Sequence, residues 1–179
     1  MKKIFVVLFT LHSSLVLSQE HFSVDVYFDP NSISISDANG NQQSAINTLV
    51  NVSVPIKDTD SGHIFLGQSI QYVNMLDEQY MRYAILQIGY SFRSFIFKKM
   101  MAGAAINYGL TKRWSQGFTN YGATFDLSYQ LNARLKLSSL FQIIRRNDME
   151  VKLGAGTPQI YKTCLFFGLK FDLFRVNYI

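Results

Sequence analysis

The sequence is poor in residues that define several common classes of protein. Its 179 residues include one cysteine, Cys164, and only three prolines. A lone cysteine excludes an internal disulfide, and we predict that Cys164 is a small buried apolar residue. No Cys/His spacing typical of zinc, no phosphate-binding loop and no nucleotide fingerprint is present. We therefore expect no metal site and no cofactor.

Long hydrophobic runs are also missing once the N-terminus is set aside. Met1–Lys3 is basic and residues 4–17 are mostly apolar, which is the pattern of a secretory signal peptide. The alternative is a transmembrane helix, but the run is shorter and more interrupted than the roughly 20 apolar residues that a helix needs. We predict a signal peptide at residues 1–18 and one domain at residues 19–179.

The net charge is modest and argues against a nucleic-acid partner. The whole chain has 17 basic and 12 acidic residues. Removing Lys2 and Lys3 with the signal peptide leaves 15 against 12, a formal charge of +3. So small an excess does not indicate binding to a polyanion.

Aromatic residues, by contrast, are abundant, with 15 Phe and 10 Tyr, and apolar residues recur with period two. The last such segment places Leu165, Phe167 and Leu169 on one face, and Lys170 and Asp172 on the other. No segment has a convincing helical period, so the sequence predicts an all-β domain. The predicted strands are residues 21–28, 45–56, 63–74, 80–92, 96–110, 120–130, 134–145 and 161–173.

The connections between these strands alternate in length. Longer connections are predicted at residues 29–44, 75–79, 111–119 and 146–160, and the turns that alternate with them are short. If the exported chain starts in the periplasm, every short turn falls on the periplasmic side, which is the rule for bacterial outer-membrane barrels. The sequence thus predicts an eight-stranded antiparallel up-and-down transmembrane β-barrel in the cell outer membrane.

Aromatic residues cluster near both ends of the apolar faces, and we interpret them as interface girdles. Tyr80 and Tyr90 are ten residues apart, which spans about 25 Å along a tilted strand. Arg82 is the charged exception on the predicted outer face, where it can snorkel. A soluble carrier barrel should instead be apolar inside. The predicted girdles are Tyr72, Tyr80, Tyr108, Tyr121 and Tyr161 at one end, and Tyr90, Tyr129 and Phe171 at the other.

Glycines and most charged residues fall on the opposite, inward face. An eight-stranded interior is only just wide enough for side chains, so charges there must neutralise one another. We expect Asp126 to reach Lys136, and Lys170 and Asp172 to close against Asp25. We interpret this network as a structural plug, with an ion path as the alternative. Its predicted members are Asp25, Lys99, Asp126, Arg134, Lys136, Lys170 and Asp172.

This architecture resembles the small eight-stranded outer-membrane barrels of the OmpX and OmpA membrane-domain type, and more loosely the PorT-like barrels. The resemblance covers essentially the whole mature chain and rests on architecture rather than on a diagnostic motif. It implies outer-membrane lipid and lipopolysaccharide as surroundings. Other outer-membrane or periplasmic proteins are further expected partners.

The function that fits best is a non-enzymatic one: a structural, adhesive or docking barrel, or a subunit of an envelope complex. A lipid-modifying enzyme is the first alternative, but His21 and His63 both map to the periplasmic end and no catalytic set converges near the outer leaflet. A narrow passive channel is the second. The loops would form the working surface, with lipopolysaccharide phosphates contacted by Lys112, Arg113, Arg145 and Arg146.

Overall fold

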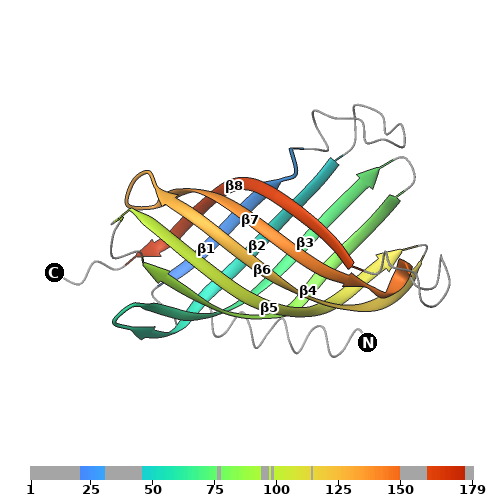
Figure 1. Cartoon of the computed structure of the whole chain (residues 1–179), viewed down its shortest axis with the longest axis horizontal. Coiled ribbons are helices and arrows are strands. Elements are labelled where there is room, and N and C mark those ends of the chain that lie inside the picture. The colour runs from blue at the N-terminus through green and yellow to red at the C-terminus, as the bar shows by residue number, and fades with distance from the viewer. Residues whose placement is uncertain are drawn as a thin grey trace.

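The computed structural model of the chain is a closed barrel of eight antiparallel strands (Figure 1). Each strand pairs with the next in sequence, and the first pairs with the last, which confirms the predicted eight-stranded up-and-down β-barrel. The strands are β1 His21–Phe28, β2 Ile46–Thr59, β3 Gly62–Met75, β4 Glu78–Arg93, β5 Met100–Arg113, β6 Gln116–Gln130, β7 Leu135–Arg146 and β8 Tyr161–Arg175.

The structure describes residues 21–30, 46–75, 78–93, 97, 99–113, 115–149 and 161–175. The predicted signal peptide and most of the predicted loops 29–44 and 146–160 lie outside these ranges. Within them, no helix has both the length and the apolar composition that crossing a membrane requires.

The predicted loop 111–119 is wrong, because β5 and β6 continue as a ladder almost to their tips. Thr111 pairs with Phe118, and Arg113 pairs with Gln116. Only residues 114–115 connect the two strands, and Ser115 takes the positive φ of 65° that such a tight turn needs.

The connections divide the barrel into two ends, to which we give names. The loop end carries the connections 29–45, 76–77, 114–115 and 147–160. The turn end carries the connections 60–61, 94–99 and 131–134. The two longest connections, 29–45 and 147–160, therefore lie at the same end, next to β1 and β8 where the sheet closes.

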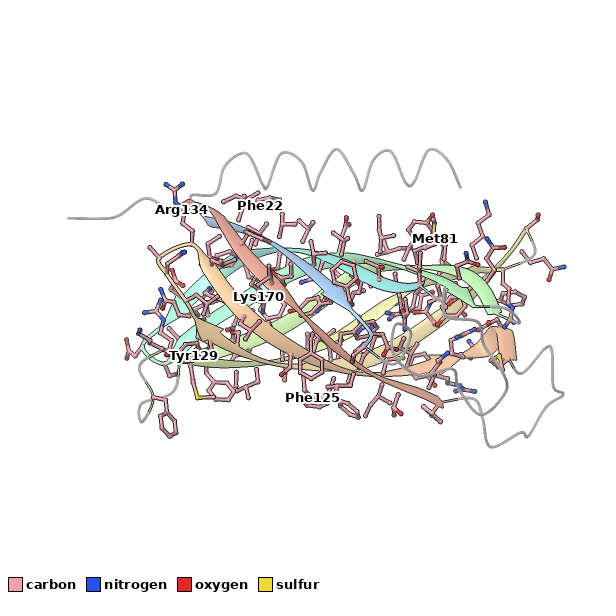
Figure 2. The ribbon with its side chains drawn as sticks, turned by 90° about the horizontal axis from the view of Figure 1, so that it is seen from above. Phe22, Met81, Phe125, Tyr129, Arg134 and Lys170 are labelled. Carbon is pink, nitrogen blue, oxygen red and sulfur yellow. The ribbon has the colours of Figure 1, made fainter. Side chains whose placement is uncertain are left out.

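The two faces of the wall are chemically opposite. Large apolar side chains are exposed on the outer face of every strand, and Ile106 reaches 70% exposure. Amide, hydroxyl and charged side chains are buried inside, among a few large apolar ones such as Tyr27 and Phe166. The side-chain view separates the two groups, with Lys170 inside the barrel and Phe125 on its outer surface (Figure 2).

One residue, Ile85, breaks the alternation of β4. Gly67 and Ser69 of β3 lie opposite Gln87 and Ala84, so β4 contains one more residue than its partner between these pairs. The same extra residue appears against β5. This is a β-bulge, which moves every residue before it to the other face of the sheet. The Ile85 carbonyl oxygen, freed from the ladder, accepts a hydrogen bond from Gln68 Nε2 at 3.0 Å.

The bulge corrects two predicted orientations. Tyr80 and Arg82 were predicted to face outward, but they face the interior with Ala84, and all three are at most 2% exposed. Tyr83 lies opposite the exposed Ile70 on the outer face. Met81 beside it is also on the outer surface (Figure 2).

The register between β6 and β7 differs from the predicted one. The predicted strands 120–130 and 134–145 leave a turn of three residues, but Gln130 lies opposite Lys136, so the connection is two residues longer. Asp126 consequently lies opposite Leu140, four residues along β7 from Lys136, and so does not make the predicted contact with Lys136. The predicted faces are unchanged, because a shift of two residues preserves the alternation of side chains.

Candidate functional site

The barrel interior near the turn end contains a network of acidic residues and lysines on four strands, which we call the turn-end network. Lys170 Nζ of β8 lies 2.7 Å from Asp126 Oδ2 of β6 and 3.8 Å from Asp25 Oδ2 of β1. Asp25 also accepts a hydrogen bond from Asn51 Nδ2 at 2.9 Å. Lys136 Nζ of β7 lies 2.9 Å from Asp172 Oδ2. The closing register makes this possible, because it sets Asp25 directly opposite Lys170.

Two residues predicted for this network do not reach it. Lys99 is exposed in the β4–β5 connection, where its Nζ lies 6.0 Å from the centre of the Tyr129 ring. Arg134 is exposed in the β6–β7 connection and points away from the barrel (Figure 2). Both were assigned by continuing strand alternation into residues that are part of turns.

A glycine makes room for the central acid of the network. Gly103 of β5 lies opposite Asp126. A Cβ atom at residue 103 would come within 2.2 Å of Asp126 Oδ1, closer than real Cβ contacts allow. The glycine therefore leaves room for the Asp126 carboxylate in the position from which it contacts Lys170.

The interior near the loop end contains a second cluster, which the sequence analysis missed. Arg82, Arg113 and Arg146 are at most 2% exposed, and we call them the loop-end arginines. Arg82 Nε donates a hydrogen bond to Asn120 Oδ1 at 2.9 Å, and its Nη2 donates one to Asn107 Oδ1. The Asn120 amide in turn donates to Thr111 Oγ1 at 3.0 Å.

Asp148 joins the other two arginines. It lies in a helical turn at residues 147–149, just after β7. Arg146 Nε donates to its Oδ1 at 2.7 Å, and Arg113 Nη1 lies 3.2 Å from its Oδ2. Burial alone would raise the pKa of Asp148, but the hydrogen bonds and charges of Arg146 and Arg113 outweigh it and lower that pKa.

Tyr80 contributes an aromatic ring to the same cluster. The Arg146 guanidinium carbon lies 3.9 Å from the centre of this ring, and Lys162 Nζ lies 5.8 Å from it. Tyr80 is 2% exposed, so it is not part of the predicted outer girdle. The other girdle residues are on the outer surface, six of them clearly exposed and Tyr90 partly so.

The four residues predicted to contact lipopolysaccharide divide by the face they occupy. Arg113 and Arg146 are buried inside the barrel, which contradicts their assignment to surface loops. Lys112 is exposed on the outer face, and Arg145 lies on the outer face against Tyr121, to which it donates a hydrogen bond. A contact between lipopolysaccharide and Lys112 or Arg145 stays a prediction.

A signal for the loop-end cluster is present in the sequence, although it is subtle. Apart from Gln79 near the end of the strand, the polar and small residues of β4 are even-numbered up to Ala84 and odd-numbered from Gln87 onward. This change of parity marks the bulge and places Arg82 inside. Arg113 lies within the predicted loop 111–119, and Arg146 is the first residue of the predicted loop 146–160. Both belong to strands that are longer than predicted, and this extension brings them into the interior.

Comparisons with protein-family models, with curated proteins and with solved structures find no match to the chain. In the part of the chain that the structure describes, no group of three or more His, Cys, Asp or Glu residues could hold a metal ion. His21 and His63 both lie near the turn end, one at the start of β1 and the other at the start of β3.

Proposed function

We propose that the chain is an exported outer-membrane β-barrel of the OmpX type with a non-enzymatic, structural or docking role. The observation that carries the proposal is the reversed distribution of side chains. Monomeric soluble proteins rarely expose contiguous apolar patches larger than a few hundred Å². Here exposed apolar residues occur on all eight strands, while ion pairs and amide networks are enclosed. An outer face of this kind is favourable in contact with lipid rather than with water.

The aromatic positions support the same proposal. Tyr108, Tyr121 and Tyr161 lie on the outer face toward the loop end, and Tyr129 and Phe171 lie toward the turn end. Rings with an apolar body and a polar edge favour both interfaces of a bilayer, and barrels of this class have an aromatic girdle at each interface. The loop end would then face the outside and the turn end the periplasm.

The proposed role is docking through the loop end, alone or as a subunit of an envelope complex. The two longest connections, 29–45 and 147–160, begin or end on the neighbouring strands β1 and β8 at this end of the barrel. A surface built from two such segments on a rigid barrel is a common arrangement for recognition. The ion pairs and large side chains of the interior favour a filled barrel over a passive channel.

Site-directed labelling tests the location and the orientation together. In a Cys164→Ser background, we would introduce Gln116→Cys at the loop end and Asp60→Cys at the turn end, both at exposed residues. A membrane-impermeant maleimide should label the first variant in intact cells, and the second only after the outer membrane is permeabilised. Recovery of the protein in the soluble periplasmic fraction would refute the proposal. Labelling of only the Asp60→Cys variant would reverse the orientation.

Purification tests the docking role separately. The tagged protein would be extracted from native membranes in mild detergent, and the co-purifying proteins identified with residues 150–160 intact or replaced by a short Gly-Ser linker, which keeps Asp148 in place. We expect a stoichiometric partner that is lost with this segment. A barrel that purifies alone in both forms, with its heat-modifiable mobility intact, would argue for a purely structural role.

A further inference from the structure

The turn end has a rim of exposed cations, distinct from the buried turn-end network. Arg93 ends β4, Lys99 lies in the β4–β5 connection and Arg134 lies in the β6–β7 connection. All three are exposed, and the same two connections expose Phe97 at 61% and Leu131 at 50%. We call these five residues the turn-end rim. Exposed cations next to large apolar side chains are typical of segments that lie in a membrane interface.

Backbone hydrogen bonds place the apolar Leu131 between two of the cations. The Gln130 N–H donates to the Lys99 carbonyl oxygen at 2.8 Å. The next N–H, that of Leu131, donates at 3.0 Å to the carbonyl oxygen of Leu135, which follows directly after Arg134. With a cation on each side, this apolar side chain can enter the acyl layer while the charges stay among the headgroups.

The rim cations have no acidic neighbour along the chain except one inside the barrel. No Asp or Glu occurs in residues 79–125 or 127–147. Asp126, the acid between these ranges, faces the interior, where it is paired with Lys170. Among the described residues, none of the three rim cations is in an ion pair. Their charge therefore acts on whatever surrounds the barrel.

The other acids at the turn end lie on other strands. Asp58 and Asp60 are exposed on the hairpin between β2 and β3. Asp172 of β8 is paired with Lys136, and Glu20 precedes β1 outside the described residues. Strands β4 to β7 are consecutive neighbours in the barrel, so the rim is a continuous cationic stretch of the turn end.

Lys99 connects the rim to the outer face of the wall. Its Nζ lies 6.0 Å from the centre of the Tyr129 ring, which is 45% exposed. Tyr129 is a member of the predicted girdle, and girdle rings lie where hydrocarbon meets headgroups. Arg134 and Tyr129 are on different sides of the turn end (Figure 2), so the cations are spread along this boundary. A leaflet that surrounds the barrel can contact all of them at once.

We propose that the turn-end rim binds the headgroups of anionic phospholipids in the leaflet around the turn end. Phe97 and Leu131 enter the boundary between headgroups and acyl chains, and the rim cations contact the lipid phosphates. This inference rests on the proposed membrane location and deepens it by naming the class of lipid. The competing partner of the same charge is an acidic protein, which would meet a rim that projects into water.

Quenching of tryptophan fluorescence by brominated lipids tests the proposal at the rim itself. The chain has one tryptophan, Trp114, so Leu131→Trp in a Trp114→Phe background reports on the rim alone. The refolded full chain is placed in mixed vesicles in which either phosphatidylglycerol or phosphatidylcholine is brominated. We expect phosphatidylglycerol to be enriched about fivefold near this tryptophan, the effect of one cation near an anionic leaflet. The enrichment should fall at high salt.

Charge substitutions identify the residues responsible. Lys99→Gln and Arg134→Gln should each lower the enrichment, and the two combined with Arg93→Gln should abolish it. Lys57→Gln is the matched control, because Lys57 is an exposed cation at the same end but lies next to Asp58 on the acidic hairpin. It should leave the enrichment unchanged. Phe97→Trp is a second reporter if Leu131→Trp does not refold.

A third reporter separates this inference from the proposed function. Phe125 is on the outer surface of the wall (Figure 2), so Phe125→Trp should be quenched by both lipids, and a lack of quenching there would refute the membrane location. With Phe125→Trp quenched, the rim proposal is overturned if the two lipids are equally represented around residue 131. It is also overturned if neither lipid quenches Leu131→Trp, as for a rim that meets an acidic protein in water, or if Lys57→Gln lowers the enrichment as much as Lys99→Gln.

Discussion

The two ends of the barrel interior bury charge in different ways. At the turn end, Lys170 and Lys136 are matched by Asp25, Asp126 and Asp172, in ion pairs that connect strands distant in sequence. At the loop end, Arg82 is held by neutral amides and two further arginines share one acid. The turn end therefore has its own counter-charges, as expected of a structural plug. The loop end instead holds its buried guanidinium groups with neutral amides, an aromatic ring and one shared carboxylate.

The largest effect should come from removing the cation at the centre of the turn-end network. Lys170→Met would leave Asp25 and Asp126 without their shared partner inside the barrel. Breaking a buried pair by removing one member costs about 3–5 kcal/mol. Urea titration of the refolded protein, followed by circular dichroism, measures the loss.

Lys99→Met is the control for this experiment, because Lys99 is an exposed lysine that the sequence placed in the same network. Its effect should stay within about 0.5 kcal/mol, as for most surface substitutions. Equal losses in the two variants would show that the network contributes nothing beyond an ordinary surface lysine.

A smaller effect is expected at the loop end from Asp148→Asn. The substitution removes the carboxylate charge shared by Arg113 and Arg146, and hydrogen bonds to charged groups contribute about 1.5–3 kcal/mol. Urea titration measures the loss, and a variant as stable as the wild type would exclude a structural role for Asp148.

The same residue predicts a pH dependence with a definite sign. The folded protein lowers the pKa of Asp148 below its ordinary value of 3.8. Its contribution to stability is therefore complete above that value and is lost as the pH falls through the lower folded-state pKa. The difference in stability between wild type and Asp148→Asn should be constant near neutral pH and shrink in acid. A difference that instead shrank toward alkaline pH would contradict the assignment.

A glycine test separates packing from charge at the turn end. Gly103→Ala would push the Asp126 carboxylate away from Lys170, and overpacking of this kind costs about 1–3 kcal/mol. Gly117→Ala is the matched control, because a Cβ atom there meets nothing within 4 Å. Equal unfolding midpoints for the two variants would mean that Asp126 relaxes at no cost.

The difference between the two ends also explains what the sequence could predict. Alternation of apolar and polar residues reports which face a residue takes as long as a strand is regular. It therefore predicted the eight strands, the closed barrel and the position of Lys170 against Asp25. This pair lies in the regular part of the ladder between β1 and β8.

The loop end depends on features that alternation does not report. The bulge at Ile85 is one inserted residue, yet it moves Tyr80 and Arg82 from the outer face to the inner one. Arg113 reaches the interior only because β5 extends into a predicted loop. Whether an extra residue is absorbed as a bulge is decided by the pairing with β3 and β5, which is a property of the assembled sheet.

The smallest effect concerns two arginine–tyrosine pairs made by consecutive residues of β7. Arg146 lies 3.9 Å from the Tyr80 ring inside the barrel, and Arg145 lies 5.4 Å from the Tyr121 ring on the outer face. Cation–π contacts contribute about 0.5–1 kcal/mol at exposed sites and about 2 kcal/mol when desolvated. Double-mutant cycles with Arg→Met and Tyr→Leu should therefore give the larger coupling for the inner pair. A larger coupling for the outer pair would contradict the placement of Tyr80 inside, and with it the bulge that turns Tyr80 and Arg82 toward the interior.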